Sequence, residues 1–348
     1  MKTPHFLSGS RKALCLFLLA AVTVLSGCGK SATTSDGKSN ALQPISFRLK
    51  WFVYAAFASH FVALEQGYYR AQGLNLTINP GGPGMDPIRL VATGVDDVGL
   101  ADYLQIILAR EKGIPVVAIG EDYIRSGVGF FSLKSSGISK PKDFEGRKVG
   151  IMPGTDKHAL YLALAKKENV DRKKITEIPV AFDSTLLLNG SIEMIPGWVT
   201  KDPFVFEERN APVNIIDPYD YGIRPGGNVY FTSEETLRKK RDQLKKFLRA
   251  TLKGIIESQK LDDDQVVAMV LKHNEKLDKN AEKKIWIASK AILLEKDPAK
   301  VGSMFMDKWQ ETEAIGREYG LVEKEVDLGK CFTNDLVDEI HREGFLVK

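Results

Sequence analysis

Cysteine is scarce in this chain of 348 residues, which has three: Cys15, Cys28 and Cys331. The first two lie in the N-terminal segment described below, so Cys331 is the one thiol left in the body of the chain. A single cysteine can form neither an intramolecular disulfide nor the cysteine cluster of a zinc or iron–sulfur site. We therefore predict no structural disulfide and no bound metal.

A strong net charge and the common cofactor motifs are also missing. Residues 1–27 carry three positive and no negative charges, so the formal charge of +4 falls to about +1 without them. A nearly balanced charge gives no electrostatic basis for binding nucleic acid. The glycine run at residues 81–84 lacks both nucleotide-binding patterns, and no Ser-His-Asp order or metal-ligand cluster is present. We expect no catalytic residue and no cofactor.

The N-terminus has the pattern of a secretory signal. Lys2, Arg11 and Lys12 precede an uncharged apolar run at residues 13–25, which is too short to span a bilayer comfortably. The following Leu-Ser-Gly-Cys, ending at Cys28, resembles the lipobox of bacterial lipoproteins, in which the cysteine receives the lipid. We predict a signal peptide over residues 1–27, lipidation of Cys28 and a flexible polar tether over residues 28–44.

Strand and helix patterns alternate from residue 45 onward. Predicted strands fall at residues 45–51, 74–79, 97–100, 116–120 and 128–133, with helices at 55–72, 87–93 and 103–112 between them. The alternation continues with strands at 148–152, 175–179, 193–198, 214–216 and 229–232. After residue 234 the composition becomes helical, beginning with one long amphipathic helix at 237–261, whose basic run we interpret as a solvated face. The pattern predicts an α/β fold with mostly parallel sheets.

Four segments resemble the type II solute-binding proteins of ABC importers, in the branch with sulfonate, taurine, nitrate and thiamine-pyrimidine binders. They are the stretch from Trp51 to Gly73 with its EQGYY…GL pattern, GVDDVG at 94–99, DFEGRKVG at 143–150, and GW…KDP followed by KFLRATLKG at 197–254. Their order and spacing cover nearly all of the chain after the tether. The resemblance implies a two-lobed periplasmic-binding-protein-like fold with a helical C-terminal region.

The same resemblance implies a domain division and a set of partners. Residues 45–133 and 234–348 would form lobe I, and residues 134–233 would form lobe II. The chain would be a monomer, bound to the membrane by its lipid on the extracytoplasmic side of the bacterial envelope. It would trap a small molecule and deliver it to an ABC permease.

Candidate ligand contacts gather where strands end, because ligands of open α/β sheets bind at the carboxyl ends of strands. Trp51, Phe52 and Tyr54 follow the first strand, and their rings could stack on a planar heterocycle. Gly82 lies in a glycine turn that is as well explained by a tight turn as by close approach of a ligand. Asp102 and Tyr103 follow a later strand, where Asp102 is equally suited to cap a helix.

The predicted second lobe supplies a matching set of candidates. Thr155 precedes a helix and is both a possible ligand contact and a possible helix cap. Trp198 and Asp202 follow a strand, and the family resemblance makes this segment a recurrent ligand wall. Tyr221 is a further candidate.

Three functions remain open at this point. A binder of a planar heterocycle such as a thiamine pyrimidine precursor is preferred, with sulfonate, taurine and riboflavin-like ligands as alternatives. A sulfonate binder would be expected to present arginine or several donors in the cleft, and the sequence places none clearly. A thiamine-pyrimidine-synthase-like enzyme would use His60, but the Asn-x-x-His segment and the cysteine-rich motif are missing. We therefore interpret His60 as a structural residue or one at the edge of the cleft. A sensory or scaffold domain is the third possibility.

Overall fold

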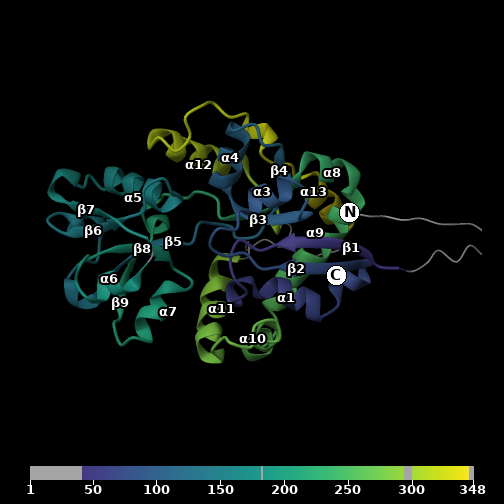
Figure 1. Cartoon of the computed structure of the whole chain (residues 1–348), viewed down its shortest axis with the longest axis horizontal. Helices are drawn as coiled ribbons and strands as arrows, with labels where there is room; N and C mark the ends of the chain where they lie inside the picture. The colour runs from purple at the N-terminus through teal and green to yellow at the C-terminus, as the bar shows by residue number, and fades with distance from the viewer. Residues whose placement is uncertain (1–40, 182, 294–299, 345–348) are drawn as a thin grey trace, which may run out of the picture. The chain divides into compact units, whose positions relative to one another are not determined.

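The first sheet of the computed structural model combines four strands from the N-terminal part of the chain with one strand from much later in the sequence (Figure 1). The structure describes residues 41–348 apart from 182, 294–299 and 345–348, so the predicted signal peptide and Cys28 lie outside the described residues. The strands stand in the order β2-β1-β3-β10-β4 and comprise β1 (Gln43–Arg48), β2 (Leu74–Asn79), β3 (Val98–Asp102), β4 (Val116–Glu121) and β10 (Asn228–Ser233). β1 pairs in parallel with β2 and β3, with Ile45 opposite Leu76, whereas β10 runs antiparallel to β3 and β4.

The second part of the chain repeats this arrangement. An antiparallel sheet of order β8-β5-β9 comprises β5 (Val128–Leu133), β8 (Ile195–Trp198) and β9 (Val213–Ile216), and β6 (Lys148–Ile151) pairs in parallel with β7 (Thr176–Pro179). A parallel bridge between Val149 and Met194 connects β6 to the chain just before β8. Together these strands follow the order β7-β6-β8-β5-β9, in which β5 alone runs against the others. We call this set the second sheet.

Two connections pass between the sheets. The chain leaves the first sheet after β4 and enters the second as β5, and it returns from β9 to the first sheet as β10. The predicted lobe division placed β5 with the first lobe and β10 with the second, and the strand pairing puts each in the other sheet. The reason is physical: a buried apolar strand has the same pattern in whichever sheet it pairs. The remaining lobe assignment stays a prediction.

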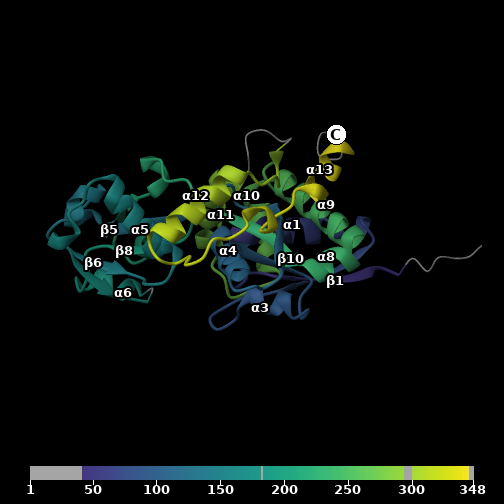
Figure 2. The ribbon, with the colours of Figure 1, turned by 90° about the horizontal axis from the view of Figure 1, so that it is seen from above.

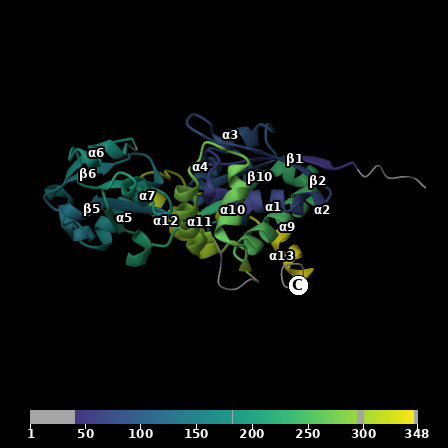
Figure 3. The same ribbon diagram turned by 90° about the horizontal axis from the view of Figure 1, so that it is seen from below.

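Helices cover the first sheet on both sides. α1 (Ala58–Glu65), α9 (Arg241–Ser258), α10 (Asp263–Leu271), α11 (Lys279–Leu293) and α13 (Asp335–Arg342) enclose one apolar core with β1 and β2. α3 (Pro87–Ala92), α4 (Tyr103–Glu111) and α12 (Met306–Glu318) enclose another with β3, β4 and β10. Figures 2 and 3 both show α3 on the opposite side of β1 from α10. The C-terminal helices therefore complete the layer begun by the N-terminal half of the chain.

α9 shows why these helices pack as they do. Leu244, Phe247, Leu248 and Ile255 recur at helical spacing and are buried, while the charged residues of the same helix are partly or fully exposed. α12 differs in that it contacts both α4 and α5 (Asp156–Lys167), and an ion pair joins Lys166 of α5 to Glu318 of α12. This helix therefore lies against elements of both halves of the fold (Figure 2).

The α/β periplasmic-binding-protein-like fold class is confirmed, but the sheets are mixed and not mostly parallel, because β10 and β5 each run antiparallel to both of their neighbours. Two of the predicted helices are interrupted. The predicted helix at 55–72 divides into a 3-10 turn (Ala55–Phe57), α1 and α2 (Tyr68–Ala71), because Gly67 adopts a left-handed conformation with φ of 71°. The predicted helix at 237–261 breaks at Lys240 into α8 (Glu234–Lys239) and α9. In both places the apolar stripe continues across the break, so periodicity alone could not locate it. Within the described part of the chain, no helix is long and apolar enough to cross a membrane.

Candidate functional site

A cleft of about 500 Å³ lies between the carboxyl ends of strands from the two sheets. The first sheet contributes the residues after β1, the glycine turn after β2, the end of β3 and the start of β10. The second sheet contributes the end of β8, the start of α7 (Asp202–Glu207) and the first turn of α5. Its volume falls within the range of pockets that enclose small ligands. We call these two contributions the first wall and the second wall.

Four aromatic residues of the first wall line the cleft: Trp51 and Tyr54 are the more accessible ones, and Phe57 and Tyr123 are buried. The Trp51 side chain is 40% exposed and meets the ring of Phe52 edge to face at 5.3 Å. Burial, together with the carboxylates of Asp202, Glu282 and Asp102, raises the pKa of Tyr54, so its phenol is uncharged near neutral pH. The wall thus offers one exposed ring at the mouth and one neutral phenol deeper in the cleft.

Gly81 holds the glycine turn against the end of β1. Its backbone N–H donates to the carbonyl of Trp51 at 2.9 Å. A Cβ at this position would lie 2.4 Å from the Leu49 carbonyl oxygen, so only glycine allows the two segments to approach this closely. The contact places Gly82 and the residues after it along the cleft.

Lys50 joins three parts of the cleft. Its Nζ donates to Asp102 at 2.5 Å and to the side chain of Asn228 at 2.7 Å, which ties the ends of β1, β3 and β10 together. The same Nζ lies 4.3 Å from the ring centroid of Trp198 on the second wall. Lys50 is therefore a direct contact between the first and second walls.

The second wall is organised around Trp198 and Asp202. The backbone N–H of Trp198 donates to the Asp202 carboxylate at 2.6 Å, and burial raises the pKa of that carboxylate. Lys157, from the first turn of α5, places its Nζ 4.5 Å from the Trp198 ring centroid. Lys201 lies 5.4 Å from the ring of Tyr54 and thus reaches the first wall. Two lysines of the second wall therefore face the aromatic groups of the cleft.

Six of the ten predicted contacts line this cleft and four do not. Those lining it are Trp51, Tyr54, Gly82, Asp102, Trp198 and Asp202. Asp102 also stands at the N-terminus of α4, where its backbone N–H donates to the Gln105 side chain at 2.9 Å. Both roles considered for Asp102 are thus present in the structure, as helix cap and as cleft-lining carboxylate. Ligand contact itself stays a prediction for all six.

Phe52, Thr155 and Tyr221 lie outside the cleft lining. Phe52 is half exposed, and its ring packs where a Cβ of Gly82 would be. The Thr155 hydroxyl donates to the Met152 carbonyl at 2.7 Å and accepts from the His158 N–H, so it caps α5. Tyr221 packs against the apolar core beneath β5 and α5. Each of these residues is occupied by a structural contact.

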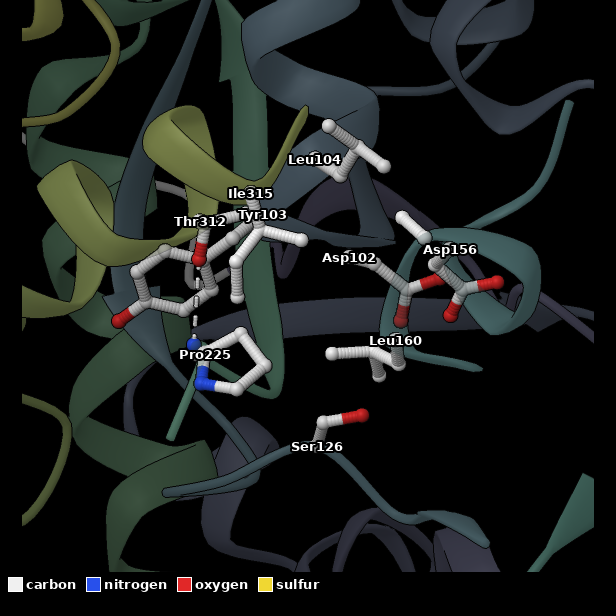
Figure 4. Close-up of a pocket in the computed structure, with 11 residues that line it drawn as sticks. Asp102, Tyr103, Leu104, Ser126, Asp156, Leu160, Pro225, Thr312 and Ile315 are labelled. Carbon is white, nitrogen blue, oxygen red and sulfur yellow. Dashed lines mark hydrogen bonds between the residues drawn. The ribbon is translucent and has the colours of Figure 1, made fainter. Parts of the chain in front are cut away.

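Tyr103 lines a separate cavity of about 30 Å³, which has room for about one water molecule. Figure 4 shows this cavity where α4, α5 and α12 meet, with a hydrogen bond between Thr312 and the backbone N–H of Gly226. Tyr103 is fully buried, donates to Glu121 at 2.6 Å and packs on Trp309 at 4.2 Å. Its ring therefore faces the core beneath the cleft.

His60 belongs to a buried network behind the first wall. The side chain is inaccessible to solvent, with one ring nitrogen 3.1 Å from the Phe57 carbonyl and the other 2.8 Å from the Tyr230 hydroxyl. Tyr230 in turn donates to Asp122 at 2.6 Å. Burial lowers the pKa of His60, so the imidazole is neutral near pH 7. The structural interpretation of this histidine agrees with its surroundings.

The polar cleft residues missed by the sequence reasoning include Lys50, Lys157, Lys201 and Asn228, together with Gln105 and Thr200. Lys50 and Lys201 directly adjoin the predicted contacts Trp51 and Asp202, so the same strand-end argument could have included them. Lys157 opens the helix that Thr155 caps. Asn228 gives no comparable signal, because it begins a strand whose sheet the sequence does not reveal.

Comparisons with known proteins agree with this geometry. The formylaminopyrimidine-binding protein of Halalkalibacterium halodurans is 25% identical over 302 residues, covering 84% of this chain and 90% of the relative. The riboflavin-binding protein RibY of Chloroflexus aurantiacus is 22% identical over 317 residues, covering 88% and 90%. Both alignments extend over nearly the whole chain.

The chain is also similar to part of a synthase and to a solved structure of a binding protein. The 4-amino-5-hydroxymethyl-2-methylpyrimidine phosphate synthase of Legionella pneumophila subsp. pneumophila is 29% identical over 108 residues, which cover 31% of this chain and 34% of the enzyme. The periplasmic aliphatic sulphonate binding protein SsuA from Escherichia coli superposes with a TM-score of 0.66 at 17% identity, covering 84% of this chain and 91% of that structure. This likeness confirms the periplasmic-binding-protein-like fold.

The sequence model of the family described as NMT1/THI5 like matches residues 55–260, which is more than half of the chain. The matched segment includes residues of both cleft walls. The chain belongs to the NMT1/THI5-like family.

Proposed function

We propose that this chain is the substrate-binding component of an ABC importer and that it traps a planar nitrogen heterocycle between its two sheets. The observation that carries the proposal is the cleft itself, whose two walls bring aromatic rings and hydrogen-bonding side chains from both sheets to one space. The two relatives aligned over nearly the whole chain are binding proteins for heterocyclic compounds by name, which supports the proposal.

The first wall suits the ring of such a ligand. The exposed Trp51 and the neutral phenol of Tyr54 offer apolar surfaces on which a flat ring can stack. A well-placed aromatic pair contributes about 0.5–1.5 kcal/mol beyond the burial of its area. The ring itself would supply most of the remaining affinity through the apolar area that it buries.

Two carboxylates and one amide of the cleft can form hydrogen bonds with polar groups at the edge of a heterocyclic ligand. Asp102 and Asp202 line the cleft from opposite walls and can accept hydrogen bonds from ring or exocyclic N–H groups. Asn228 can both donate and accept. A heterocycle that satisfies groups of both walls at once would favour the closed arrangement of the two sheets, with the two connections between the sheets acting as hinges.

A synthase-like reaction is less well supported. The enzyme hypothesis assigned a role to His60, and this side chain is buried and hydrogen-bonded on both ring nitrogens away from the cleft lining. The matched synthase aligns with only about a third of this chain. Binding without covalent chemistry accounts for the cleft more directly.

We also propose that the protein is anchored on the extracytoplasmic face of a bacterial membrane, and the pattern of the N-terminal segment supports this. Signal cleavage before Cys28 and lipidation of that residue would leave a polar tether ahead of β1. We expect Cys28→Ala to move the protein from the membrane fraction to the soluble extracytoplasmic fraction. Retention of this variant in the membrane would contradict lipid anchoring.

A ligand panel tests the binding function. The chain is titrated calorimetrically with riboflavin, a formylaminopyrimidine and taurine, and we expect saturable binding of a heterocycle. Trp51→Ala should weaken that binding by up to about ten-fold, since stacking contributes about 0.5–1.5 kcal/mol. Ile287→Ala, an exposed apolar residue of α11 outside the cleft lining, serves as the matched control and should bind normally. Binding of taurine alone would overturn the choice of a heterocycle.

A further inference from the structure

Three lysines line the cleft: Lys50 from the first wall, and Lys157 and Lys201 from the second. An ammonium group has three N–H donors and no acceptor. Lys50 uses two of its donors on Asp102 and Asn228, and Lys157 uses one on the adjacent Asp156 at 3.3 Å. Lys201 has no ion pair within 4.0 Å among the residues that the structure describes. The cleft therefore contains several cationic donors that the protein itself does not occupy.

Trp198 brings two of these ammonium groups together. The Nζ atoms of Lys50 and Lys157 lie 4.3 Å and 4.5 Å from the centroid of the same ring, although Lys50 belongs to the first wall and Lys157 to α5 of the second wall. An aromatic face attracts a cation more weakly than a negatively charged oxygen does. Lys157 and the one unused N–H donor of Lys50 can therefore gain by binding an acidic group placed beside the ring.

Four carboxylates lie near the lysines, and each already accepts a hydrogen bond within the protein. Asp156 accepts from Lys157, and the charges of Lys157 and Lys50 both lower its pKa. Asp102 accepts from Lys50, and Asp202 accepts from the backbone N–H of Trp198 at 2.6 Å. Glu282, the other acidic group near Lys201, accepts from the backbone N–H of Ala55 at 2.5 Å. Burial raises the pKa of both Asp202 and Glu282 while the charge of Lys201 lowers it, but neither carboxylate forms an ion pair with Lys201 within 4.0 Å. Among the described residues, Lys50 and Lys157 each have a carboxylate in an ion pair and Lys201 has none.

We propose that Lys50, Lys157 and Lys201 form an anion subsite beside Trp198, so that the preferred ligand is a planar heterocycle carrying a carboxylate, sulfonate or phosphate group. The inference rests on the proposed binding function and specifies the chemical class of the ligand. The subsite takes donors from both sheets, so the acidic group bridges them and favours closure of the cleft on the ligand.

Matched ligand pairs test this subsite. Riboflavin is compared with its 5′-phosphate, and nicotinamide with nicotinate and pyridine-3-sulfonate, by titration calorimetry on the full chain at low and high salt. The pairs share a ring and differ in the acidic group, so they separate phosphate from carboxylate and sulfonate. We expect the acidic member of a bound pair to bind at least ten-fold more tightly at low salt, and the preference to shrink as salt screens the charges.

Lysine variants assign the preference to these side chains. Lys157→Met and Lys201→Met should each lower the affinity ratio of acidic to neutral ligand, and the double variant should bring it close to one. Lys173→Met, an exposed lysine outside the cleft lining, should leave the ratio unchanged. The ratio is also insensitive to a general loss of folded protein, because both ligands are measured on the same sample.

The outcomes separate this inference from the proposed function. Equal or weaker binding of the acidic ligands by the native chain, with the neutral heterocycles still bound, overturns the anion subsite and leaves the heterocycle-binding function standing. An undiminished ratio in the double variant also overturns it. Failure of every heterocycle to bind overturns the proposed function together with the subsite.

Discussion

Gly81 is the position where a single methyl group should disturb the cleft most. A Cβ there would lie 2.4 Å from the Leu49 carbonyl oxygen, 2.6 Å from the Lys50 carbonyl carbon and 2.7 Å from the Trp51 nitrogen. Comfortable separations between such atoms begin at about 3.3 Å, so the two segments must move apart by roughly 0.5–1 Å. All three neighbours are backbone atoms, and no side-chain rotation can relieve the contact.

The cost of Gly81→Ala has two parts. Overpacking of this kind costs about 1–3 kcal/mol, and loss of the Gly81 N–H bond to the Trp51 carbonyl would add about 0.5–1.5 kcal/mol. We therefore expect the melting temperature to fall by roughly 3–8 °C for a chain of this size. The displaced backbone carries Trp51, so affinity for a bound heterocycle should fall as well.

Thermal melting and ligand titration of two variants check this reasoning. Gly137→Ala is the control: Gly137 has a φ of 74°, no atom lies within 4 Å of its Cβ position, and it is outside the cleft lining. The control should lose about 1–2 kcal/mol through left-handed strain, with unchanged ligand affinity. A Gly81→Ala protein as stable as the native chain, or one that binds ligand normally, would refute the role assigned to this contact.

Two further predictions concern stability. Tyr230→Phe removes the hydroxyl that lies between His60 and Asp122, and the groups left unpaired should lower the free energy of unfolding by about 1–3 kcal/mol in urea denaturation; an unchanged midpoint would contradict this network. The Arg241 hydrogen bond holds the pKa of Glu339 at about 2, below the ordinary 4.5, so its stabilisation is present above pH 4.5 and is lost as the pH falls through about 2. The stability difference between the native chain and Glu339→Gln should therefore shrink on acidification, and a constant difference would be evidence against this pair.

The alternation of apolar and polar residues carried most of the fold prediction. Residues 74–79 and 128–133 were predicted as strands, and β2 and β5 have the same bounds. Strand ends were predictable because turn residues and glycines punctuate the sequence locally. The helix break at Lys240 was not, since neither glycine nor proline marks it and the apolar stripe continues into α9.

The sheet that a strand joins depends on residues far away in the chain, so it could not be predicted from the local sequence pattern. β10 lies between β3 and β4, more than 100 positions earlier in the chain, with Tyr230 opposite Leu100. Nothing in the local pattern of residues 228–233 distinguishes this partner from the neighbouring β9. The predicted lobe boundaries therefore failed at the strands that cross between the sheets.

Three aromatic residues of the candidate site were predicted from their positions at strand ends. The lysines of the site were not predicted. Trp51 and Tyr54 were selected because ligands bind where strands end and aromatic rings can stack on them, and Trp198 was selected through its strand end and the family resemblance. Lys50 was not among the predicted contacts, and nothing local distinguishes it from a solvated lysine. Its partners Asp102 and Asn228 stand 52 and 178 positions away, so its role in the cleft depends on the folded chain.

Hydrogen–deuterium exchange with and without a bound heterocycle tests the central claim most directly. The claim is that one ligand contacts both walls of the cleft. We predict slower exchange in the segment after β1 (residues 50–57) and also in the segment after β8 (residues 198–202) on addition of the heterocycle that binds most tightly. Protection confined to one wall, or located outside the cleft, would contradict the account.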